Sequence, residues 1–255
     1  MNNRKQIYQS IEEHTRELHL PSIRQHFAES IQEAQLKESS YEDFLLDLLQ
    51  KEADRRHQAA KESRIRLADF PNKKYLEDLA TECLPEDARK KLKTLTALDF
   101  IKQGQNIILA GNPGTGKTHL AIGLGIRACM EGYRVMFTTI PLLINQLKES
   151  RSDRTLRALG NKFAKYDLVI ADELGYISFD KEGSELLFTH LSLRSGRKST
   201  IITTNLSFER WSEIFHDPVM TAAMVDRMTY KSYMINMNGN SYRLRETKAW
   251  LEQTQ

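Results

Sequence analysis

The segment GNPGTGKT, from Gly111 to Thr118, constrains the fold of this 255-residue chain more than any other stretch. It fits the pattern G-x-x-x-x-G-K-[ST] at every fixed position, and it lies between an apolar run, NIILA, and a helical run, HLAIGLGIRACM. Backbone N–H groups must approach phosphate oxygens closely in such a loop, so Gly111, Gly114 and Gly116 leave space where side chains would obstruct. The pattern therefore predicts a strand, a phosphate-binding loop and a helix in succession.

Several residues of this loop have separate expected roles. The start of the following helix adds a dipole that favours an anion. Lys117 supplies a positive charge to the β- and γ-phosphates of ATP, and Thr118 offers its hydroxyl to Mg²⁺. For His119, in the first helical turn, packing or capping is a commoner role than ligand binding. The predicted nucleotide-binding residues are Gly111, Asn112, Pro113, Gly114, Thr115, Gly116, Lys117, Thr118 and His119.

Apolar or β-branched runs alternate with helical patterns over the larger part of the chain. Strands are expected at 106–111, 134–140, 166–172, 199–205 and 231–237. Helices are expected at 119–130, 141–148, 155–163, 183–194 and 207–228, the last in two pieces broken at Asp217-Pro218. This alternation predicts an α/β fold with a five-stranded parallel sheet that helices cover on both faces.

The N-terminal part of the chain differs in composition and in sequence pattern. Residues 7–66 are polar and helical in pattern, with no strand-like run and no glycine. Ser40 and Asp43 are helix-start signals ahead of apolar residues at helical spacing. Pro71 then limits any helix at the preceding residue. We expect a small all-helical domain over 1–68 and a nucleotide-binding domain over 69–255, with the boundary near 67–72.

Composition excludes several classes of protein. Hydrophobic residues make up 40% and charged residues 28%, which suits a packed core, and a net charge of +3 excludes a histone-like polycation. Cys83 and Cys129 lie far apart in no CxxC pair, which indicates a reducing compartment. No signal-like run begins the chain, and no apolar stretch approaches the ~18 residues of a membrane span. A soluble, cytoplasmic protein without a membrane partner is expected.

Two adjacent carboxylates end the apolar run in LVIADELGYIS. Asp172 is expected at the carboxyl edge of the sheet, where ligands of open α/β sheets collect, and it can hold Mg²⁺ there. Glu173 is expected just beyond the strand end, where it can act as general base toward a water aligned on the γ-phosphate. P-loop kinases need no such base, so the pair indicates hydrolysis. The alternative for Glu173 is a solvated turn residue.

Two further polar residues have candidate catalytic roles. Asn205 ends another apolar strand and can orient the attacking water or sense the γ-phosphate; the alternative is a helix N-cap, a role that Ser207 could also fill. Arg227 precedes the last strand and suits insertion into a neighbouring subunit's site, where it would stabilise charge on the γ-phosphate. A surface salt bridge with Asp226 or Glu213 is the alternative.

Four segments in order, GNPGTGKTHLA, LVIADELGY, TTN and MVDRM, resemble the IstB-type transposition helpers. These are AAA+ ATPases encoded beside a transposase in bacterial insertion sequences, and relatives of the DnaC helicase loaders. The resemblance implies Walker A and B motifs, a sensor at Asn205 and a trans-acting finger at Arg227, so the catalytic set is Lys117, Glu173, Asn205 and Arg227. It also implies ATP-dependent homo-oligomers that deform DNA and recruit a transposase.

The chain departs from the wider AAA+ pattern at its C-terminus. Only about 18 residues follow the last expected strand, too few for a helical lid with a second sensor arginine. The narrower IstB and DnaC groups are likewise lidless. Arg243 and Arg245 in SYRLRE are candidates for nucleotide or DNA contact and are left unassigned.

Basic clusters are the candidates for largely sequence-independent contact with double-stranded DNA. The preferred cluster lies between the second and third strands, the next lies in the N-terminal region, and the turn RSGRKS contributes a third; a solvated face is the commoner alternative for any one of them. The candidates are Lys148, Arg151, Arg154, Arg157, Lys162 and Lys165, then Arg55 and Arg56 of the N-terminal cluster, then Arg194, Arg197 and Lys198.

Three other functions compete with a transposition helper. A DnaC-like helicase loader would be the same kind of ATPase acting on a replicative helicase in place of a transposase. The neighbouring gene, a transposase gene or a replication gene, decides between the two. A P-loop kinase of a small metabolite predicts phosphate transfer and no stimulation by DNA. A binding adaptor, whose helical N-terminal region holds a partner, predicts turnover near zero even with DNA present.

Overall fold

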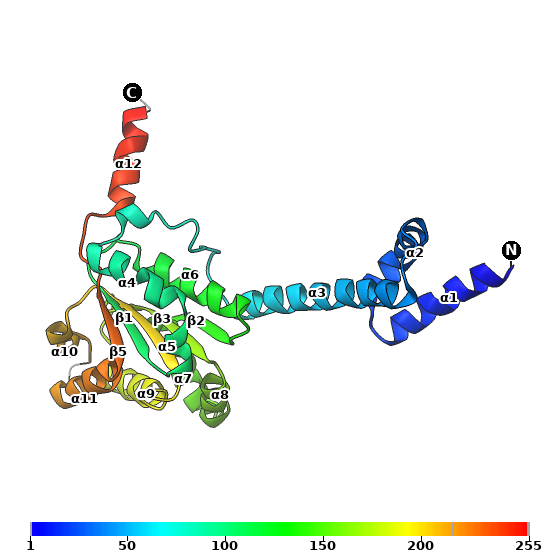
Figure 1. Cartoon of the computed structure of the whole chain (residues 1–255). Coiled ribbons are helices and arrows are strands. Elements are labelled where there is room, and N and C mark those ends of the chain that lie inside the picture. Colours follow the sequence, from blue (N-terminus) through cyan, green and yellow to red (C-terminus); the bar gives the residue numbers. More distant parts are fainter. Residues whose placement is uncertain (1, 216, 254–255) are drawn as a thin grey trace. The chain divides into compact units, whose positions relative to one another are not determined.

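The computed structural model describes residues 2–215 and 217–253 (Figure 1). The chain forms two compact units, Met1–Ser63 and Arg64–Gln255, and the division falls within one long helix. We call them the N-terminal unit and the C-terminal unit.

The N-terminal unit is made of helices alone in the described residues. They are α1 (Asn2–Glu17), α2 (Pro21–Leu36) and the part of α3 (Tyr41–Leu67) up to residue 63. Its core is small: Phe27 is buried and packs edge-on against Tyr8, with ring centroids 5.1 Å apart. The Ser40 hydroxyl accepts the N–H of Asp43 at 3.1 Å, so the predicted start of this helix is confirmed.

The C-terminal unit contains a five-stranded, wholly parallel sheet in the order β2-β3-β4-β1-β5, which confirms the predicted α/β fold. The strands are β1 (Asn106–Ala110), β2 (Val135–Thr139), β3 (Leu168–Leu174), β4 (Ser199–Thr204) and β5 (Ser232–Asn236). Its helices are η1 (Thr81–Cys83), α4 (Glu86–Thr96), α5 (Asp99–Lys102), α6 (Lys117–Met130), α7 (Ile140–Ser152), α8 (Leu156–Ala164), α9 (Lys181–Ser192), η2 (Phe208–Trp211), α10 (Ser212–Phe215), α11 (Pro218–Thr229) and α12 (Tyr242–Gln253).

Helices cover both faces of the sheet, as Figure 1 shows. Successive strand residues point to opposite faces, so Ile107 and Leu109 join one apolar cluster with α4, α5 and α6, while Ile108 joins another with α7, α9 and α11. All three side chains are fully buried, which explains why the strand reads as a continuous apolar run.

The ends of several elements differ from the sequence-based prediction. Strand β3 continues past Asp172 to Leu174, and α4, α5 and α12 were not predicted as helices. The break at Asp217-Pro218 is confirmed, because α11 begins at Pro218 and the Asp217 carboxylate accepts the N–H of Met220 at 2.9 Å. Among the described residues, α12 is the one helix that follows β5, so no helical lid is present there.

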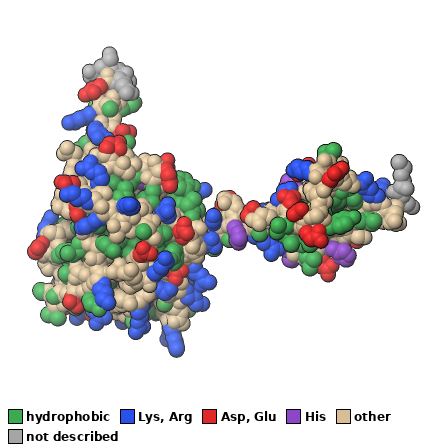
Figure 2. Space-filling model, viewed as in Figure 1, with side chains coloured by type: hydrophobic (Ala, Val, Ile, Leu, Met, Phe, Trp, Pro, Cys, Tyr) green, Lys and Arg blue, Asp and Glu red, His purple; other side chains and the backbone are tan. Residues whose placement is uncertain are grey.

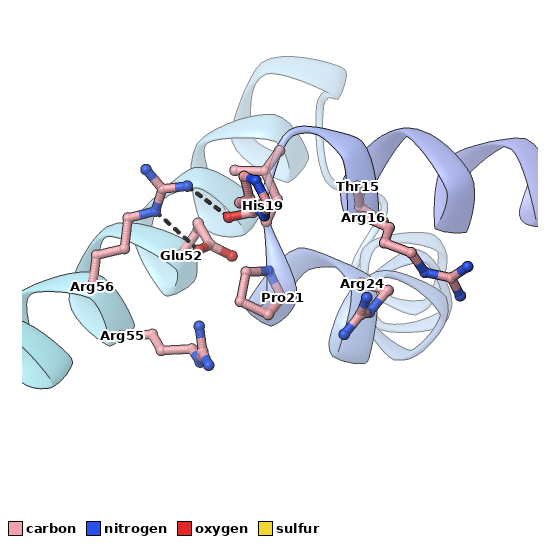
Figure 3. A pocket seen from close by; sticks show the side chains of 9 residues that line it. Thr15, Arg16, His19, Pro21, Arg24, Glu52, Arg55 and Arg56 are labelled. Carbon is pink, nitrogen blue, oxygen red and sulfur yellow. Dashed lines mark hydrogen bonds and ion pairs between the residues drawn. The ribbon is translucent and has the colours of Figure 1, made fainter.

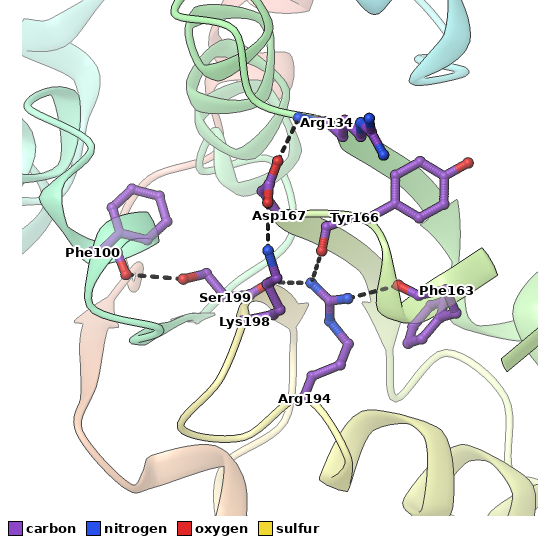
Figure 4. A network of polar contacts seen from close by, with 8 residues as sticks. All are labelled: Phe100, Arg134, Phe163, Tyr166, Asp167, Arg194, Lys198 and Ser199. Atoms are coloured by element: carbon purple, nitrogen blue, oxygen red, sulfur yellow. Dashed lines mark hydrogen bonds and ion pairs between the residues drawn. The ribbon is translucent and has the colours of Figure 1, made fainter. Parts of the chain in front are cut away.

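A buried arginine ties the amino-terminal ends of β3 and β4 together (Figure 4). Arg194 is 2% exposed and donates to the carbonyl oxygens of Phe163 at 2.8 Å, Tyr166 at 3.1 Å and Ser199 at 2.9 Å. Burial lowers the pKa of this guanidinium to about 10. The sequence-based placement of Arg194 in a DNA-contacting cluster was therefore wrong, because its donors serve backbone carbonyls in the interior.

Candidate nucleotide-binding site

The loop between β1 and α6 has the backbone geometry that a phosphate-binding loop requires. Gly114 and Gly116 have φ values of 79° and 91°, a left-handed conformation that favours glycine. Gly116 is the N-cap of α6, so the free N–H groups of that helix face the loop. The Lys117 Nζ donates to the carbonyl oxygens of Gly111 at 2.6 Å and Asn112 at 2.7 Å, which keeps the cation inside the loop.

The segment after β5 packs directly against this loop. A Cβ atom added at Gly111 would lie 2.2 Å from the carbonyl carbon of Met237, and one at Gly114 would lie 2.2 Å from the Ser241 hydroxyl oxygen. The N–H of Tyr242 donates to the carbonyl of Gly114 at 2.9 Å. Glycine is therefore required at these positions by the chain's own packing, as well as by the approach of phosphate.

A second positive charge lies near the loop lysine. Burial lowers the pKa of Lys117; the charge of Asp172 opposes this change, and the charge of Arg243 adds to it. Sequence reasoning left Arg243 unassigned, because nothing local connects the start of α12 with a loop more than a hundred residues earlier. A bound anion would relieve this repulsion between the charges of Lys117 and Arg243.

The metal-binding candidates lie within hydrogen-bond distance of each other. Asp172 is 3% exposed, and its Oδ1 accepts from the Thr118 hydroxyl at 3.1 Å and from the Thr203 hydroxyl. Thr203 belongs to β4, the strand beside β3. This hydroxyl was missed by sequence reasoning, because a threonine in a buried strand carries no signal that distinguishes it from its neighbours.

A β-bulge separates the two adjacent acids. Ala171 pairs with Ile202 and Leu174 pairs with Thr204, so Asp172 and Glu173 together oppose a single residue of β4. Glu173 has a φ of 68°, a sparsely populated conformation for a residue other than glycine.

The consequence of the bulge is a division of the acids. The N–H of Glu173 donates to the Thr203 hydroxyl at 3.0 Å, and its side chain is exposed while that of Asp172 is buried. Glu173 was expected beyond the end of the strand; it lies inside β3, and the bulge turns it outward.

Asn205 and His119 occupy different surroundings. Asn205 follows β4, which lies between the strand of the loop and the strand of the acids. Its Oδ1 is buried and has no hydrogen-bond partner among the described residues. The ring of His119 donates from Nε2 to the carbonyl oxygen of Tyr75 at 3.0 Å, which favours packing over contact with nucleotide.

Arg227 lies near the end of α11 and is exposed. Its guanidinium lies over the ring of Phe188, 5.2 Å from the centroid, and forms no ion pair within the described residues. Glu213 pairs with Arg210 at 2.9 Å, so the expected alternative partner is engaged elsewhere. The guanidinium of Arg227 is thus presented on the surface.

The basic clusters differ in how many charges they leave unpaired. Lys148 pairs with Asp180 at 2.7 Å and Arg151 with Glu182 at 3.3 Å, which ties α7 to the start of α9. Lys198 pairs with Asp167. In the cluster between β2 and β3, the exposed basic residues that form no ion pair with any described residue are Arg154, Arg157, Lys162 and Lys165. Figure 2 shows basic and acidic side chains interspersed on the visible face of each unit.

The site fits a nucleoside triphosphate and a divalent cation. The loop provides N–H groups and Lys117 for phosphate oxygens, while Thr118 and Asp172 provide hard oxygen ligands for Mg²⁺. Within the described residues, no three or more His, Cys, Asp or Glu side chains are arranged so that they could hold a metal ion by themselves. A cation at Thr118 and Asp172 would therefore draw its remaining ligands from phosphate and water.

The sheet order, the loop and the acid pair together define a P-loop NTPase of the AAA+ class. Two solved structures share the fold. The AMPPCP-bound DnaA from Aquifex aeolicus matches with a TM-score of 0.55 at 21% identity, over 72% of this chain and 57% of DnaA. DnaI matches with a TM-score of 0.55 at 20% identity, over 69% of this chain and 93% of DnaI.

Within that class, the chain belongs to the family of IstB-like ATP binding proteins, whose model matches residues 13–249. An ATP-binding protein named for insertion sequence IS21, from Pseudomonas aeruginosa, is 36% identical over 91% of this chain and 87% of its own length. One named for IS5376, from Geobacillus stearothermophilus, is 34% identical over 93% of this chain and 95% of its own length. The resemblance stated from the motifs is thus confirmed.

The described residues contain no helix that combines the length and the apolar character needed to cross a membrane.

Proposed function

We propose that this protein is an ATP-hydrolysing AAA+ ATPase that assembles on DNA and serves a transposase during transposition. The observation that carries the proposal is the placement of three groups beside the loop: the Thr118 hydroxyl, the buried Asp172 and the outward Glu173. Family membership adds support, because relatives are named as ATP-binding proteins of insertion sequences.

The chain's own groups divide the hydrolysis between them. Lys117 leaves the carbonyls of the loop and binds the β- and γ-phosphates, while Thr118 and Asp172 would hold Mg²⁺, which would supply positive charge to neutralise the phosphates. Glu173 accepts a proton from a water that attacks the γ-phosphorus. The bond from that phosphorus to the bridging oxygen breaks, and ADP and phosphate result. Asn205, one strand away, orients the water or senses the γ-phosphate.

Assembly follows from the position of Arg227. Its guanidinium is exposed and makes contacts with the Phe188 ring rather than with its own loop, so it is available to a neighbouring copy. There it stabilises the charge that develops on the γ-phosphate. ATP then joins subunits through composite sites, and hydrolysis via Glu173 releases them.

The DNA and transposase parts of the proposal rest on the relatives and on unpaired basic residues. Arg154, Arg157 and Lys162 are exposed and offer charge to phosphates without reading bases. The insertion-sequence names of the relatives support a transposase as client over a replicative helicase. Identifying the adjacent gene, and co-purifying its product with this chain in ATP, separates the two clients.

The central test measures the ATPase rate and the assembly mass, with and without duplex DNA, in ATP and in ADP. We expect DNA to stimulate release of phosphate, and the mass to be larger in ATP. Glu173→Gln should bind ATP and form DNA-bound assemblies without turnover, whereas Glu131→Gln, at an exposed acid after α6, should behave as wild type. Turnover near zero with DNA would favour an adaptor, and phosphate transfer to a metabolite would favour a kinase.

A further inference from the structure

A cavity of about 480 Å³ opens in the N-terminal unit, where α1, the turn into α2 and α3 meet (Figure 3). Four of its nine lining residues are arginines, and Glu52 is the one acid among them. The arginines come from three separate helices, which the fold brings to one concave surface.

The negative charge of Glu52 is balanced by hydrogen bonds and an ion pair within the N-terminal unit. Its side chain is buried, and its carboxylate accepts the N–H groups of Ser22 at 2.8 Å and Ile23 at 3.2 Å, and the Nε of Arg56 at 3.1 Å. Burial alone would raise the pKa of Glu52, but these hydrogen bonds hold it below its usual value. The carboxylate is therefore charged at neutral pH and caps the start of α2, which has no cap of its own.

The guanidinium of Arg56 also has its hydrogen-bond partners within the N-terminal unit. Besides the contact with Glu52, its Nη2 donates to the carbonyl oxygen of His19 at 2.8 Å. Arg56 was predicted from sequence as a DNA contact, and the structure gives it a bracing role beside the cavity.

The other three arginines of the cavity have no such partners. Arg16 on α1, Arg24 on α2 and Arg55 on α3 are exposed, and none forms an ion pair with a carboxylate in the part of the chain that the structure describes. In the view of Figure 3, Arg24 and Arg55 lie on either side of Pro21. The cavity thus carries a surplus of positive charge that the unit itself does not neutralise.

We infer that this cavity binds the phosphodiester backbone of duplex DNA through Arg16, Arg24 and Arg55. Guanidinium groups present planar pairs of donors that match phosphate oxygens. Phosphates recur along a duplex, so arginines that come from three separate helices can each meet one. The inference rests on the proposed function and adds to it a second DNA contact, in the N-terminal unit.

The test compares two variants that each remove two positive charges from this unit. Arg24→Ala/Arg55→Ala empties the cavity of two arginines, while Lys5→Ala/Lys37→Ala removes two exposed lysines that do not line it. Binding to a short duplex of random sequence is measured over a range of KCl concentrations, in ATP. The cavity variant should lower the slope of log Kd against log[KCl] by about 2, because each lost phosphate contact contributes about 0.9.

Several outcomes would overturn the inference. The inference is refuted if the cavity and lysine variants have equal slopes while both are folded by circular dichroism and have normal DNA-free ATPase rates. The proposed function then still stands. If the wild-type protein does not bind duplex DNA, both the inference and the proposed function are refuted. The thermal unfolding midpoint is also measured in inorganic phosphate and in chloride at equal ionic strength. If phosphate raises the midpoint of the wild-type protein but not of the cavity variant, and the DNA-binding slope of that variant is unchanged, the cavity binds a small free anion instead.

Discussion

Replacing Thr203 by valine tests whether the bulge in β3 is what separates the two acids. The hydroxyl accepts the N–H of Glu173 at 3.0 Å and donates to Asp172, and valine keeps the shape of the side chain while removing both contacts. Leaving the bulged N–H without an acceptor should lower the free energy of unfolding by about 1–3 kcal/mol. The strained φ of 68° at Glu173 then loses its support.

The activity of Thr203→Val should fall further than its stability implies. A misplacement of the general base by about 1 Å can cost on the order of 100-fold in rate, so kcat for ATP should fall roughly 10- to 100-fold. The affinity for ATP should change little, because the phosphate-binding loop is untouched. Single-turnover hydrolysis and equilibrium binding of a fluorescent ATP analogue measure the two quantities separately.

Two further variants make this test specific. Thr203→Ser keeps the hydroxyl and should keep most of the activity. Thr200→Val alters a buried threonine of the same strand, whose hydroxyl accepts from Arg194 at 3.3 Å, and should lower stability without a selective loss of kcat. A wild-type kcat in Thr203→Val, or equal losses in Thr203→Val and Thr200→Val, would refute the positioning role.

The remaining predictions concern four cationic side chains. Lys117→Ala should lose ATP binding, and unchanged affinity in a binding titration would contradict its role. Arg227→Ala should bind ATP without hydrolysing it; mixing it with Lys117→Ala should restore turnover, and no restoration would count against action in trans. Arg243→Ala should weaken ATP binding more than Arg227→Ala does, and equal affinities by calorimetry would argue against contact with phosphate. Arg194→Met should lower the free energy of unfolding by about 3–5 kcal/mol in urea titrations, because buried carbonyls lose their donor; an unchanged midpoint would refute this.

Local patterns predicted the strands and the loop well. Each strand of the sheet lies in a short apolar or β-branched run, and the loop is a contiguous motif, so the information for both lies within short segments. The break at Asp217-Pro218 was predictable for the same reason, since proline restricts the residue before it. Helix α12 was missed because its apolar period is weak, and α5 because it is only four residues long, whereas α4 was missed although its apolar residues recur at helical spacing.

The partners of individual basic residues were harder to predict from the sequence. Arg194 belongs to a sequence cluster of positive charge, yet it is 2% exposed and bonds carbonyls from two other segments. Lys148 and Arg151 were candidates for DNA contact and are ion-paired to Asp180 and Glu182 at the start of α9. Whether a basic residue is available to DNA depends on partners distant in the chain, and a one-dimensional charge pattern does not contain them.

By itself the sequence determined the class of fold and the presence of a phosphate-binding loop and an acid pair, because each is encoded in residues that are contiguous. Only the tertiary structure decided that Asp172 is buried while Glu173 is exposed, with the hydroxyl of Thr203 on the neighbouring strand bonded to both. It also brought Arg243 toward Lys117, and it gathered Arg16, Arg24 and Arg55 around one cavity. These arrangements depend on strand pairing and helix packing, which join residues that no local pattern relates.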